Sequence, residues 1–194
     1  MDDNEYLQSR RRKGYFFRAL KYLIVAFLIV VPFEWFVAQP FVVSGSSMIP
    51  TFTDNEYLVI DKISYHWRTL RRGDVIIFHY PLDPSFFFIK RIVGLPGEVV
   101  HVDASGRVTI TGEKGSVQVL SEPYTSSPST KKDLSSTTLM ANEYFVLGDN
   151  REESADSRQW GPLMEKFIVG RAFMSVLPFK KAGFFPGAHH FDKK

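Results

Sequence analysis

Apolar residues follow two different patterns along this chain. Between Leu23 and Phe33, eleven consecutive residues are apolar, so a helix over this stretch would have no polar face. After Phe52 the pattern becomes one of short runs rich in β-branched and aromatic residues, separated by Gly, Pro, Asp and Ser, which is typical of strands and turns. We therefore predict a mostly β domain of coiled antiparallel sheets, preceded by one N-terminal transmembrane helix. The predicted strand runs are 56–65, 73–80, 86–102, 107–112, 117–120, 143–149 and 167–178.

The N-terminal apolar segment is predicted to anchor the protein in a membrane over residues 22–38. These 17 residues would extend about 25 Å as an α-helix, which is sufficient if charged side chains at both ends reach the membrane interfaces. Residues 1–21 carry six basic and three acidic side chains, a net charge of +3 that equals the net charge of the whole chain. The positive-inside rule then places residues 1–21 in the cytoplasm and residues 39–194 on the outer side of the membrane.

Two other interpretations of this segment stay open. It could be a cleavable signal peptide, although cleavage after Ala38 would place the bulky Phe36 where a small residue is expected. It could also be a helix of the protein core, although the lack of a polar face disfavours that. In the anchor interpretation, Glu34 is expected near the outer interface.

Composition narrows the functions open to the rest of the chain. The sequence has 194 residues, enough for one domain, and no cysteine, which excludes disulfides and thiol catalysis. Residues 22–194 are neutral overall, whereas a nucleic-acid-binding protein would need a basic face on its folded body. Residues 121–142 are polar and rich in Ser and Thr, and we expect a flexible surface excursion there, within a smaller inserted lobe over 101–142.

Lys90 lies inside the apolar run PSFFFIKRIVGLPG. Strand alternation places it on one face with Phe88 and Ile92, while Ile89 and Arg91 point the other way. If the face of the lysine is buried, desolvation lowers its pKa and makes it a usable general base. If the strand lies at a sheet edge, an outward lysine protects against aggregation, and from the strand alone this second interpretation is favoured.

The serines of SGSSMIPTF, residues 44–52, need a base before one of them can act as a nucleophile. Only His79, at the end of VIIFHY, is a plausible histidine base, and a histidine satisfied at a strand end is the favoured interpretation. No GxSxG motif occurs. An SxxK pattern at Ser129 and Lys132 lies in the Ser/Thr-rich segment without the motifs that accompany it in enzymes, so we attribute it to chance.

The segment GDNREESADSRQWG, residues 148–161, directly follows the apolar run EYFVL. Its alternation of Asp149, Arg151, Asp156 and Arg158 indicates a self-paired loop that positions another group. A loop with this many charges can also be merely solvated.

Four stretches of the chain, taken in order, resemble the sequence blocks of the bacterial type I signal peptidases, the leader peptidase family of Ser-Lys endopeptidases. They are SGSSMIPTF, GDVIIF, FIKRIVGLPGE and GDNREESADSRQWG, and with the anchor the resemblance covers residues 15–178. It implies that Ser47 is the nucleophile, Lys90 the general base and Ser154 the serine that orients the lysine. The ion-pairing positions that brace the site are matched by Asp149, Asp156, Arg158 and Arg91. The positions that line the P1 and P3 pockets are matched by Phe41, Val43, Met48, Phe88 and Ile89.

The activity that the resemblance implies is removal of signal peptides from exported precursor proteins. The enzyme would be a single-pass serine endopeptidase of the cytoplasmic membrane, in contact with membrane lipids, and would cleave after small residues in an Ala-x-Ala pattern without metal or cofactor. Enterobacterial-type members place a serine two positions before the nucleophile to help the oxyanion hole. Gly45 stands there in this chain, so the hole would depend on the backbone N–H of Ser47, assisted by Ser46 or Ser44.

Three other functions are weighed against this one. A self-cleaving repressor-type Ser-Lys peptidase would carry an Ala-Gly site before the serine, but the only Ala-Gly pair here is Ala182–Gly183. A specialised peptidase that matures pilin or conjugation proteins is separated from a signal peptidase only by its substrates. A catalytically inactive, membrane-anchored β scaffold is disfavoured because Ser47, Lys90 and Ser154 are all present.

The segment AFMSVLPFKKAGFFPG, residues 172–187, combines several phenylalanines with Lys180 and Lys181. The favoured interpretation is a core strand followed by a loose tail. The alternative is that Phe184 and Phe185 enter a membrane interface while the lysines meet anionic head groups.

Overall fold

The computed structural model describes residues 15, 18–28, 30, 38–62, 68–112, 115–126 and 135–191. The chain divides into two compact units, Met1–Ala38 and Gln39–Lys194. In the first unit, residues 18–28 are helical. The described residues contain no helix that is both long and apolar enough to cross a membrane, and the predicted anchor lies partly outside them, at residues 29 and 31–37.

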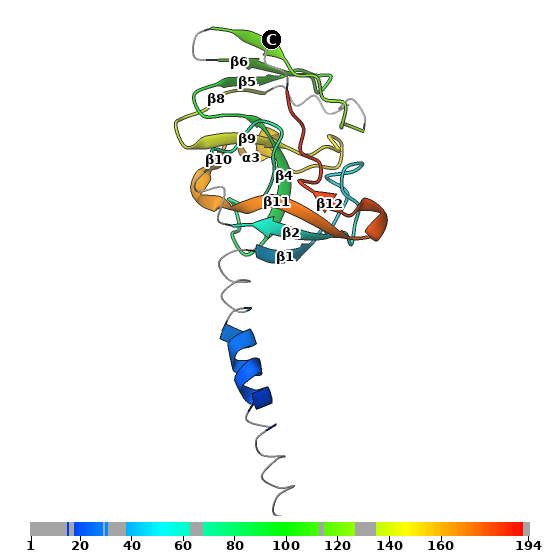
Figure 1. Cartoon of the computed structure of the whole chain (residues 1–194). Helices are drawn as coiled ribbons and strands as arrows, with labels where there is room; N and C mark the ends of the chain where they lie inside the picture. Colours follow the sequence, from blue (N-terminus) through cyan, green and yellow to red (C-terminus); the bar gives the residue numbers. More distant parts are fainter. Residues whose placement is uncertain are drawn as a thin grey trace, which may run out of the picture. The chain divides into compact units, whose positions relative to one another are not determined.

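The second unit is built mainly from antiparallel strands, which confirms the mostly β prediction (Figure 1). Its pairs β11–β2, β11–β3, β3–β4 and β4–β9 are antiparallel. Three strands of the main sheet, β1, β10 and β12, fall outside the predicted runs. The main sheet has the order β1 (Ala38–Val42), β2 (Tyr57–Asp61), β11 (Ile168–Leu177), β3 (Val75–His79), β4 (Phe87–Gly94), β9 (Glu143–Leu147) and β10 (Leu163–Met164), and β12 (Gly183–Phe184) pairs with β11.

A second, four-stranded sheet has the order β7 (Val117–Val119), β6 (Val108–Thr111), β5 (Val99–Val102) and β8 (Ser135–Thr138). The predicted run 86–102 is divided between the two sheets, because a turn closed by Glu98 N–H on the carbonyl of Leu95 separates β4 from β5. The expectation of an unstructured excursion over 121–142 is wrong at β8, which pairs with β5 along its whole length. Strands pair through backbone hydrogen bonds whatever their side chains are. A strand of Ser and Thr therefore shows no apolar periodicity from which it could be predicted.

Short helical turns connect the remaining strands. They are α3 (Ser157–Trp160), η1 (Glu165–Phe167) and η2 (Phe179–Lys181). The α3 turn follows Asp156, whose side chain accepts a hydrogen bond from the N–H of Arg158 and so caps the helix. This cap fixes the direction in which the charged segment leaves β9.

Strand β4 is paired on both edges, with β3 and β9, and its residues from Lys90 to Gly94 are buried because hydrophobic clusters pack against both of its faces. Phe88 and Ile92 belong to one hydrophobic cluster, with Phe78 and Val146. Ile89 packs against a different cluster that contains Val75. The predicted alternation along β4 is therefore correct, and the interpretation of Lys90 as an outward lysine at a sheet edge is wrong.

Candidate active site

Ser47 lies in the turn that joins β1 to β2. Two backbone hydrogen bonds shape this turn, from Ile49 N–H to the carbonyl of Ser46 and from Phe52 N–H to the carbonyl of Met48. The side chains of Met48 and Phe52 are fully buried in a hydrophobic cluster with residues of β2, β3 and β11. Because the turn is anchored by these two side chains, Ser47 is held in a defined position although it belongs to a connection between strands.

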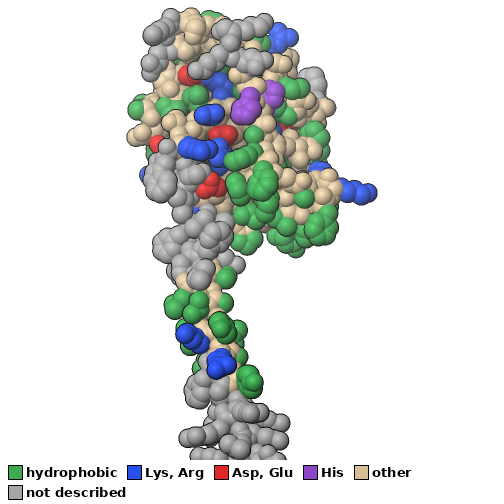
Figure 2. All heavy atoms as spheres, viewed as in Figure 1, with side chains coloured by type: hydrophobic (Ala, Val, Ile, Leu, Met, Phe, Trp, Pro, Cys, Tyr) green, Lys and Arg blue, Asp and Glu red, His purple; other side chains and the backbone are tan. Residues whose placement is uncertain are grey.

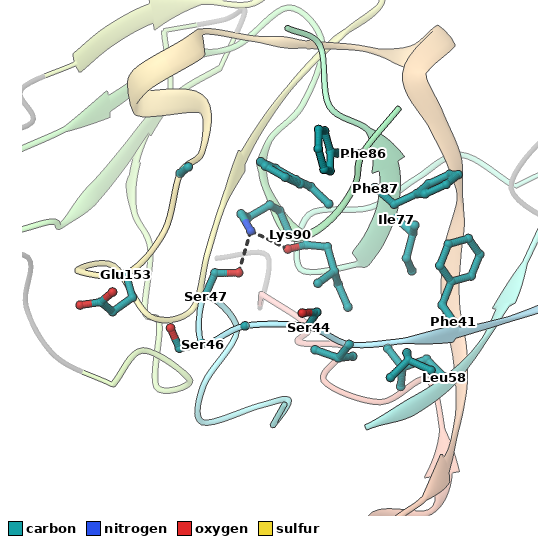
Figure 3. Close-up of a pocket in the computed structure, with 16 residues that line it drawn as sticks. Phe41, Ser44, Ser46, Ser47, Leu58, Ile77, Phe86, Phe87, Lys90 and Glu153 are labelled. Carbon is teal, nitrogen blue, oxygen red and sulfur yellow. Dashed lines mark hydrogen bonds between the residues drawn. The ribbon is translucent and has the colours of Figure 1, made fainter. Parts of the chain in front are cut away.

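Lys90 reaches Ser47 from the middle of β4. Its Nζ lies 2.7 Å from Oγ of Ser47 and 2.9 Å from the carbonyl oxygen of Ile89, and both interactions are drawn in Figure 3. Only 4% of the lysine is exposed. Two residues that are 43 positions apart in the sequence are thus brought within hydrogen-bond distance in a place with little water.

Burial changes the acid–base behaviour of Lys90. Desolvation lowers the pKa of its amine from 10.5 to about 8, while the charges of Asp156 and Asp149 act to raise it. An amine with a pKa near 8 is partly neutral at physiological pH, and its lone pair can accept the proton of the Ser47 hydroxyl. The arrangement can therefore activate a serine nucleophile without a histidine.

His79 does not take part in this arrangement. Its Nδ1 lies 2.7 Å from the carbonyl oxygen of Pro84, and its ring is 4.5 Å from that of Phe87. It is a satisfied histidine at the end of β3, as expected from the sequence. The second serine–lysine pattern, Ser129 with Lys132, lies outside the described residues.

Asp149 forms a buried ion pair with Arg91. The guanidinium Nε and Nη2 of Arg91 lie 2.8 and 2.6 Å from the two carboxylate oxygens, so the pair is bidentate. Both side chains are about 1% exposed. The hydroxyl of Thr51 also donates to Asp149, which ties the carboxylate to the turn that carries Ser47. This buried pair links the core of β4 to the nucleophile turn.

Asp156 and Arg158 form a second bidentate pair, with N–O distances of 2.8 and 2.9 Å. Asp156 also accepts a hydrogen bond from the N–H of Gly148, so it folds the charged loop back on itself. Arg151 donates to the carbonyl of Gly148 within the loop, but its ion-pair partner is Glu122, which lies with Gly106, another acceptor, in the segment that carries the second sheet. The predicted self-paired loop is thus correct for Asp156 and Arg158, whereas Asp149 and Arg151 pair with residues outside the loop.

Asn150 holds the backbone carbonyls of Ser46 and of the nucleophile Ser47. Its N–H donates to the carbonyl of Ser47 over 3.0 Å, and its side-chain amide donates to the carbonyl of Ser46 over 3.2 Å. The charged loop after β9 therefore contacts the nucleophile turn directly. Sequence reasoning missed Asn150, although it lies between the predicted Asp149 and Ser154.

Ser154 is buried, but the structure does not show the expected contact with Lys90. Within the described chain, its Oγ has no hydrogen-bond partner, and Lys90 is held by Ser47 and by its own strand. Ser154 lies against Gly148, where an added Cβ would come within 2.3 Å of its Oγ and 2.5 Å of the carbonyl oxygen of Ser47. A glycine at 148 is thus needed for the loop to approach the nucleophile turn.

A cleft of about 460 Å³ opens beside Ser47 and Lys90. Of the five residues predicted to line the P1 and P3 pockets, four do line this cleft, namely Phe41, Val43, Phe88 and Ile89. Met48 does not, because its side chain points into the core. Figure 3 shows the aromatic wall on one side of Ser47 and Glu153 with Ser46 on the other. Sequence reasoning missed the lining residues Leu58, Ile77, Phe86, Phe87, Glu153 and Ala155.

The oxyanion region begins at Gly45, which has a φ of +95° that favours glycine. Its N–H donates to the carboxylate of Asp54 over 2.9 Å and is therefore engaged. Ser44 and Ser46 both line the cleft. The described residues include no group of three or more His, Cys, Asp or Glu side chains able to hold a metal ion.

Replacing the buried amine should stabilise the fold. The lowering of the Lys90 pKa from 10.5 to about 8 corresponds to about 3 kcal/mol by which the folded state disfavours the charged amine. Below pH 8 the amine is charged in both the folded and the unfolded state, and the full cost is present. As pH rises from 8 to 10.5 the folded state loses its proton first, and the cost disappears.

We therefore predict that Lys90→Met raises the free energy of unfolding at pH 7 by up to about 3 kcal/mol, and that this gain shrinks toward zero near pH 10.5. Urea unfolding of both proteins at three pH values measures it. If Lys90→Met is instead less stable than the wild type at pH 7, burial of the charged amine does not destabilise the fold.

The family model described as "Signal peptidase, peptidase S26" matches residues 16–177. The chain is 37% identical to a signal peptidase I of Leptolyngbya laminosa, over 84% of this chain and 81% of the relative. It is 35% identical to a probable signal peptidase I-1 of Synechocystis, over 83% and 82%. A crystal structure of a signal peptidase I from Enterococcus faecalis covers 54% of this chain and 97% of that chain, with 28% identity and a TM-score of 0.45. The family match and the identities to these relatives show that the chain belongs to the signal peptidase family, peptidase S26, as an enzyme of the signal peptidase I type.

Proposed function

We propose that the protein is a membrane-bound serine endopeptidase that removes signal peptides from exported precursor proteins and cleaves after small P1 residues. The observation that carries this proposal is the distance of 2.7 Å between Nζ of Lys90 and Oγ of Ser47 at the wall of an apolar cleft. A serine and a desolvated lysine in this arrangement are what acyl transfer by a Ser-Lys dyad requires.

In the proposed mechanism, neutral Lys90 accepts the proton of the Ser47 hydroxyl as Oγ attacks the carbonyl carbon of the P1 residue. The tetrahedral intermediate collapses, the C–N bond breaks, and the leaving amine takes its proton from the lysine ammonium. The signal peptide remains bound to Ser47 as an ester. Lys90 then takes a proton from a water molecule, whose oxygen attacks the ester carbonyl. The ester bond breaks, the lysine ammonium returns the proton to Oγ of Ser47, and the signal peptide is released as a carboxylate.

The developing oxyanion would be stabilised by the backbone N–H of Ser47, with the hydroxyls of Ser44 and Ser46 in the same cleft as supporting donors. We assign positioning roles to the ion pairs of Asp149 with Arg91 and of Asp156 with Arg158. They fix the loop that contacts the nucleophile turn. Ser154 keeps a proposed supporting role because it is buried beside Gly148, which also adjoins the carbonyl of Ser47, and its Oγ has no partner within the described residues.

The cleft favours small side chains next to the scissile bond. Phe41, Val43, Phe88 and Ile89 bound it closely, and the ring of Phe41 lies 5.1 Å from that of Phe87 in an edge-to-face contact. A signal peptide in extended conformation would direct alternate side chains, P1 and P3, toward these walls. This is the basis on which we propose the Ala-x-Ala preference.

Membrane attachment is proposed from the sequence. Residues 22–38 would form the anchor, residues 1–21 a basic cytoplasmic flank, and residues 39–194 an outer peptidase domain that includes the smaller lobe over 101–142. Precursors with N-terminal signal peptides and membrane lipids would be the partners. A membrane location near Ser47 suits substrates that are themselves held in the bilayer by their signal peptides.

The dyad predicts both a mutational and a pH response. Ser47→Ala and Lys90→Ala should each lower precursor cleavage by at least about 10⁴-fold, because neither nucleophile nor base can be replaced by water in the site. His79→Ala should retain most of the activity. Since Lys90 must be neutral, kcat/KM should rise with pH through about 8.

The measurement is cleavage of a purified precursor in detergent, followed by gel shift across pH 6–10. A folded but inactive His79→Ala enzyme would contradict the Ser-Lys mechanism. Efficient cleavage of pilin-type precursors alone would instead favour a specialised maturation peptidase, and no cleavage of any precursor would favour a scaffold.

The walls of the cleft predict a dependence on the size of P1. Substitution of Ala by Val at P1 of a precursor should lower kcat/KM by about 10-fold or more, because two added methyl groups meet the fixed side chains at the cleft wall. A series of P1 variants with Gly, Ala, Val and Leu measures this. Equal cleavage of P1 Ala and P1 Leu would show that these side chains do not form the P1 pocket.

An exposed aromatic surface is the part of the second unit that suits contact with lipids. Phe179 and Phe184 are 82% and 68% exposed, beside the exposed Lys180 and Lys181. Figure 2 shows hydrophobic side chains gathered at the end of this unit where β12 and β1 lie. Aromatic rings next to lysines are typical of surfaces that enter an anionic interface.

We predict that a protein without residues 1–38 binds vesicles containing anionic lipid, and that Phe179→Ser with Phe184→Ser weakens binding about 10-fold or more. Met140→Ser is the matched control, because Met140 is 73% exposed but lies next to the second sheet. Vesicle co-sedimentation measures it. Binding that the double variant leaves unchanged would assign these rings a structural role only.

A further inference from the structure

The C-terminal segment Gly187–Phe191 runs from the main sheet to the second sheet. It follows β12, and a turn closed by Ala188 N–H on the carbonyl of Phe185 redirects the chain. Phe191 then packs against the core of the second sheet. In Figure 1 this is the red trace that leaves β12 toward β5 and β6. The segment lies beyond residue 177, where the family match ends.

Along this route the segment closes around the guanidinium of Arg91. Nη1 of Arg91 donates to the carbonyl of Gly187 and, over 2.9 Å, to the carbonyl of Gly73. The guanidinium carbon lies 3.9 Å from the ring centre of Tyr124, whose ring meets that of His189 edge to face at 5.2 Å. The segment Gly187–Phe191, called the tail below, thus supplies one hydrogen-bond acceptor, the carbonyl of Gly187, and one supporting ring, that of His189.

The fit between the tail and the nucleophile turn leaves no room for a side chain. Gly187 has a φ of +71°, and an added Cβ would lie 2.4 Å from Cγ2 of Thr51. On the opposite side, a Cβ at Gly73 would lie 1.8 Å from the carbonyl oxygen of His189. Both glycines allow the tail to lie directly against the turn and against the strand that carries Arg91.

We propose that Gly187–Phe191 is a positioning element of the active site, which holds Arg91 so that its partner Asp149 keeps the Ser47 turn in place. The chain of contacts is continuous. Asp149 accepts the hydroxyl of Thr51, and the next residue, Asn150, donates to the carbonyls of Ser46 and Ser47. The kinetic part of this inference depends on the proposed signal-peptide cleavage.

The tail also acts on the charge balance around Lys90. Asp149 is one of two carboxylates that raise the pKa of this lysine, and Arg91 partly neutralises it. A displaced Arg91 would leave Asp149 less compensated and move the pKa of Lys90 upward. Other charged and titratable groups lie near Lys90 and near the pair of Arg91 with Asp149. On the side of Lys90 they are Glu153, which lines the cleft, and Asp156 with Arg158. Around Arg91 and Asp149 they are Tyr124, His189, Glu122 and Arg151.

The test compares Gly187→Ala with Gly183→Ala in the full chain. Gly183 lies in β12 with no heavy atom within 4 Å of an added Cβ, so it is the matched control. Gly187→Ala should lower kcat/KM for a precursor about 10- to 100-fold and shift the rise with pH to higher pH, because the reacting groups are displaced. Gly183→Ala should resemble the wild type in both.

Hydrogen–deuterium exchange gives a readout that needs no activity. In Gly187→Ala, amides of residues 44–52 and 148–151 should exchange at least several-fold faster than in Gly183→Ala. If Gly187→Ala does not fold, His189→Ala against the exposed His190→Ala gives the same comparison. Unchanged exchange and an unchanged pH profile, with or without a lower Tm, overturn the proposal. If the wild type cleaves no precursor, the proposed function fails while the exchange result still decides this inference.

Discussion

Desolvation of a single amine is the constraint on which this active site depends. Lys90 is buried in the middle of β4, an interior strand, and its charge finds little water there. The same burial that costs stability makes the amine a base near neutral pH. A lysine on an exposed strand would remain charged and could not take a proton from Ser47.

The surrounding carboxylates could cancel this effect, and the fold prevents them from doing so. Asp149 and Asp156 both lie near enough to raise the pKa of Lys90. Each is instead engaged bidentately by an arginine, Arg91 or Arg158. The negative charges are thus used to hold the loop after β9, and their effect on the lysine stays smaller than that of desolvation. These buried ion pairs position the loop after β9 more than they stabilise the fold.

Local sequence patterns predicted only part of the site, and the pairing of Ser47 with Lys90, 43 positions apart, was implied by the family resemblance. Strand alternation correctly placed Lys90 with Phe88, and the charged segment after β9 correctly indicated ion pairs. Alternation alone could not say whether Lys90 faced water, since that depends on which segments cover this face of β4, and one of them is the distant turn that carries Ser47. The direction of Met48 was missed for a similar reason, because a turn residue shows no periodicity that separates core from cleft.

The parts that sequence patterns did not reveal depend on contacts between distant segments. Leu58 and Ile77 lie within predicted strand runs and carry no sign of a site in the sequence. Only the sheet order brings them to the cleft. Strand β8 is made of Ser and Thr, and its antiparallel pairing with β5 has no apolar pattern in the sequence that could predict it. The tail around Arg91 has no local signature apart from Gly187, whose close approach to Thr51 is visible only in three dimensions.

The central claim is that Lys90 is a desolvated amine, and a direct titration tests it. The full chain in detergent, labelled with ¹³C at the lysine ε carbons, can be followed by NMR from pH 6 to 11, with Lys90→Met used to assign the signal. A desolvated Lys90 should titrate with a midpoint of about 8. A midpoint near 10.5, the value of an exposed lysine, would contradict it.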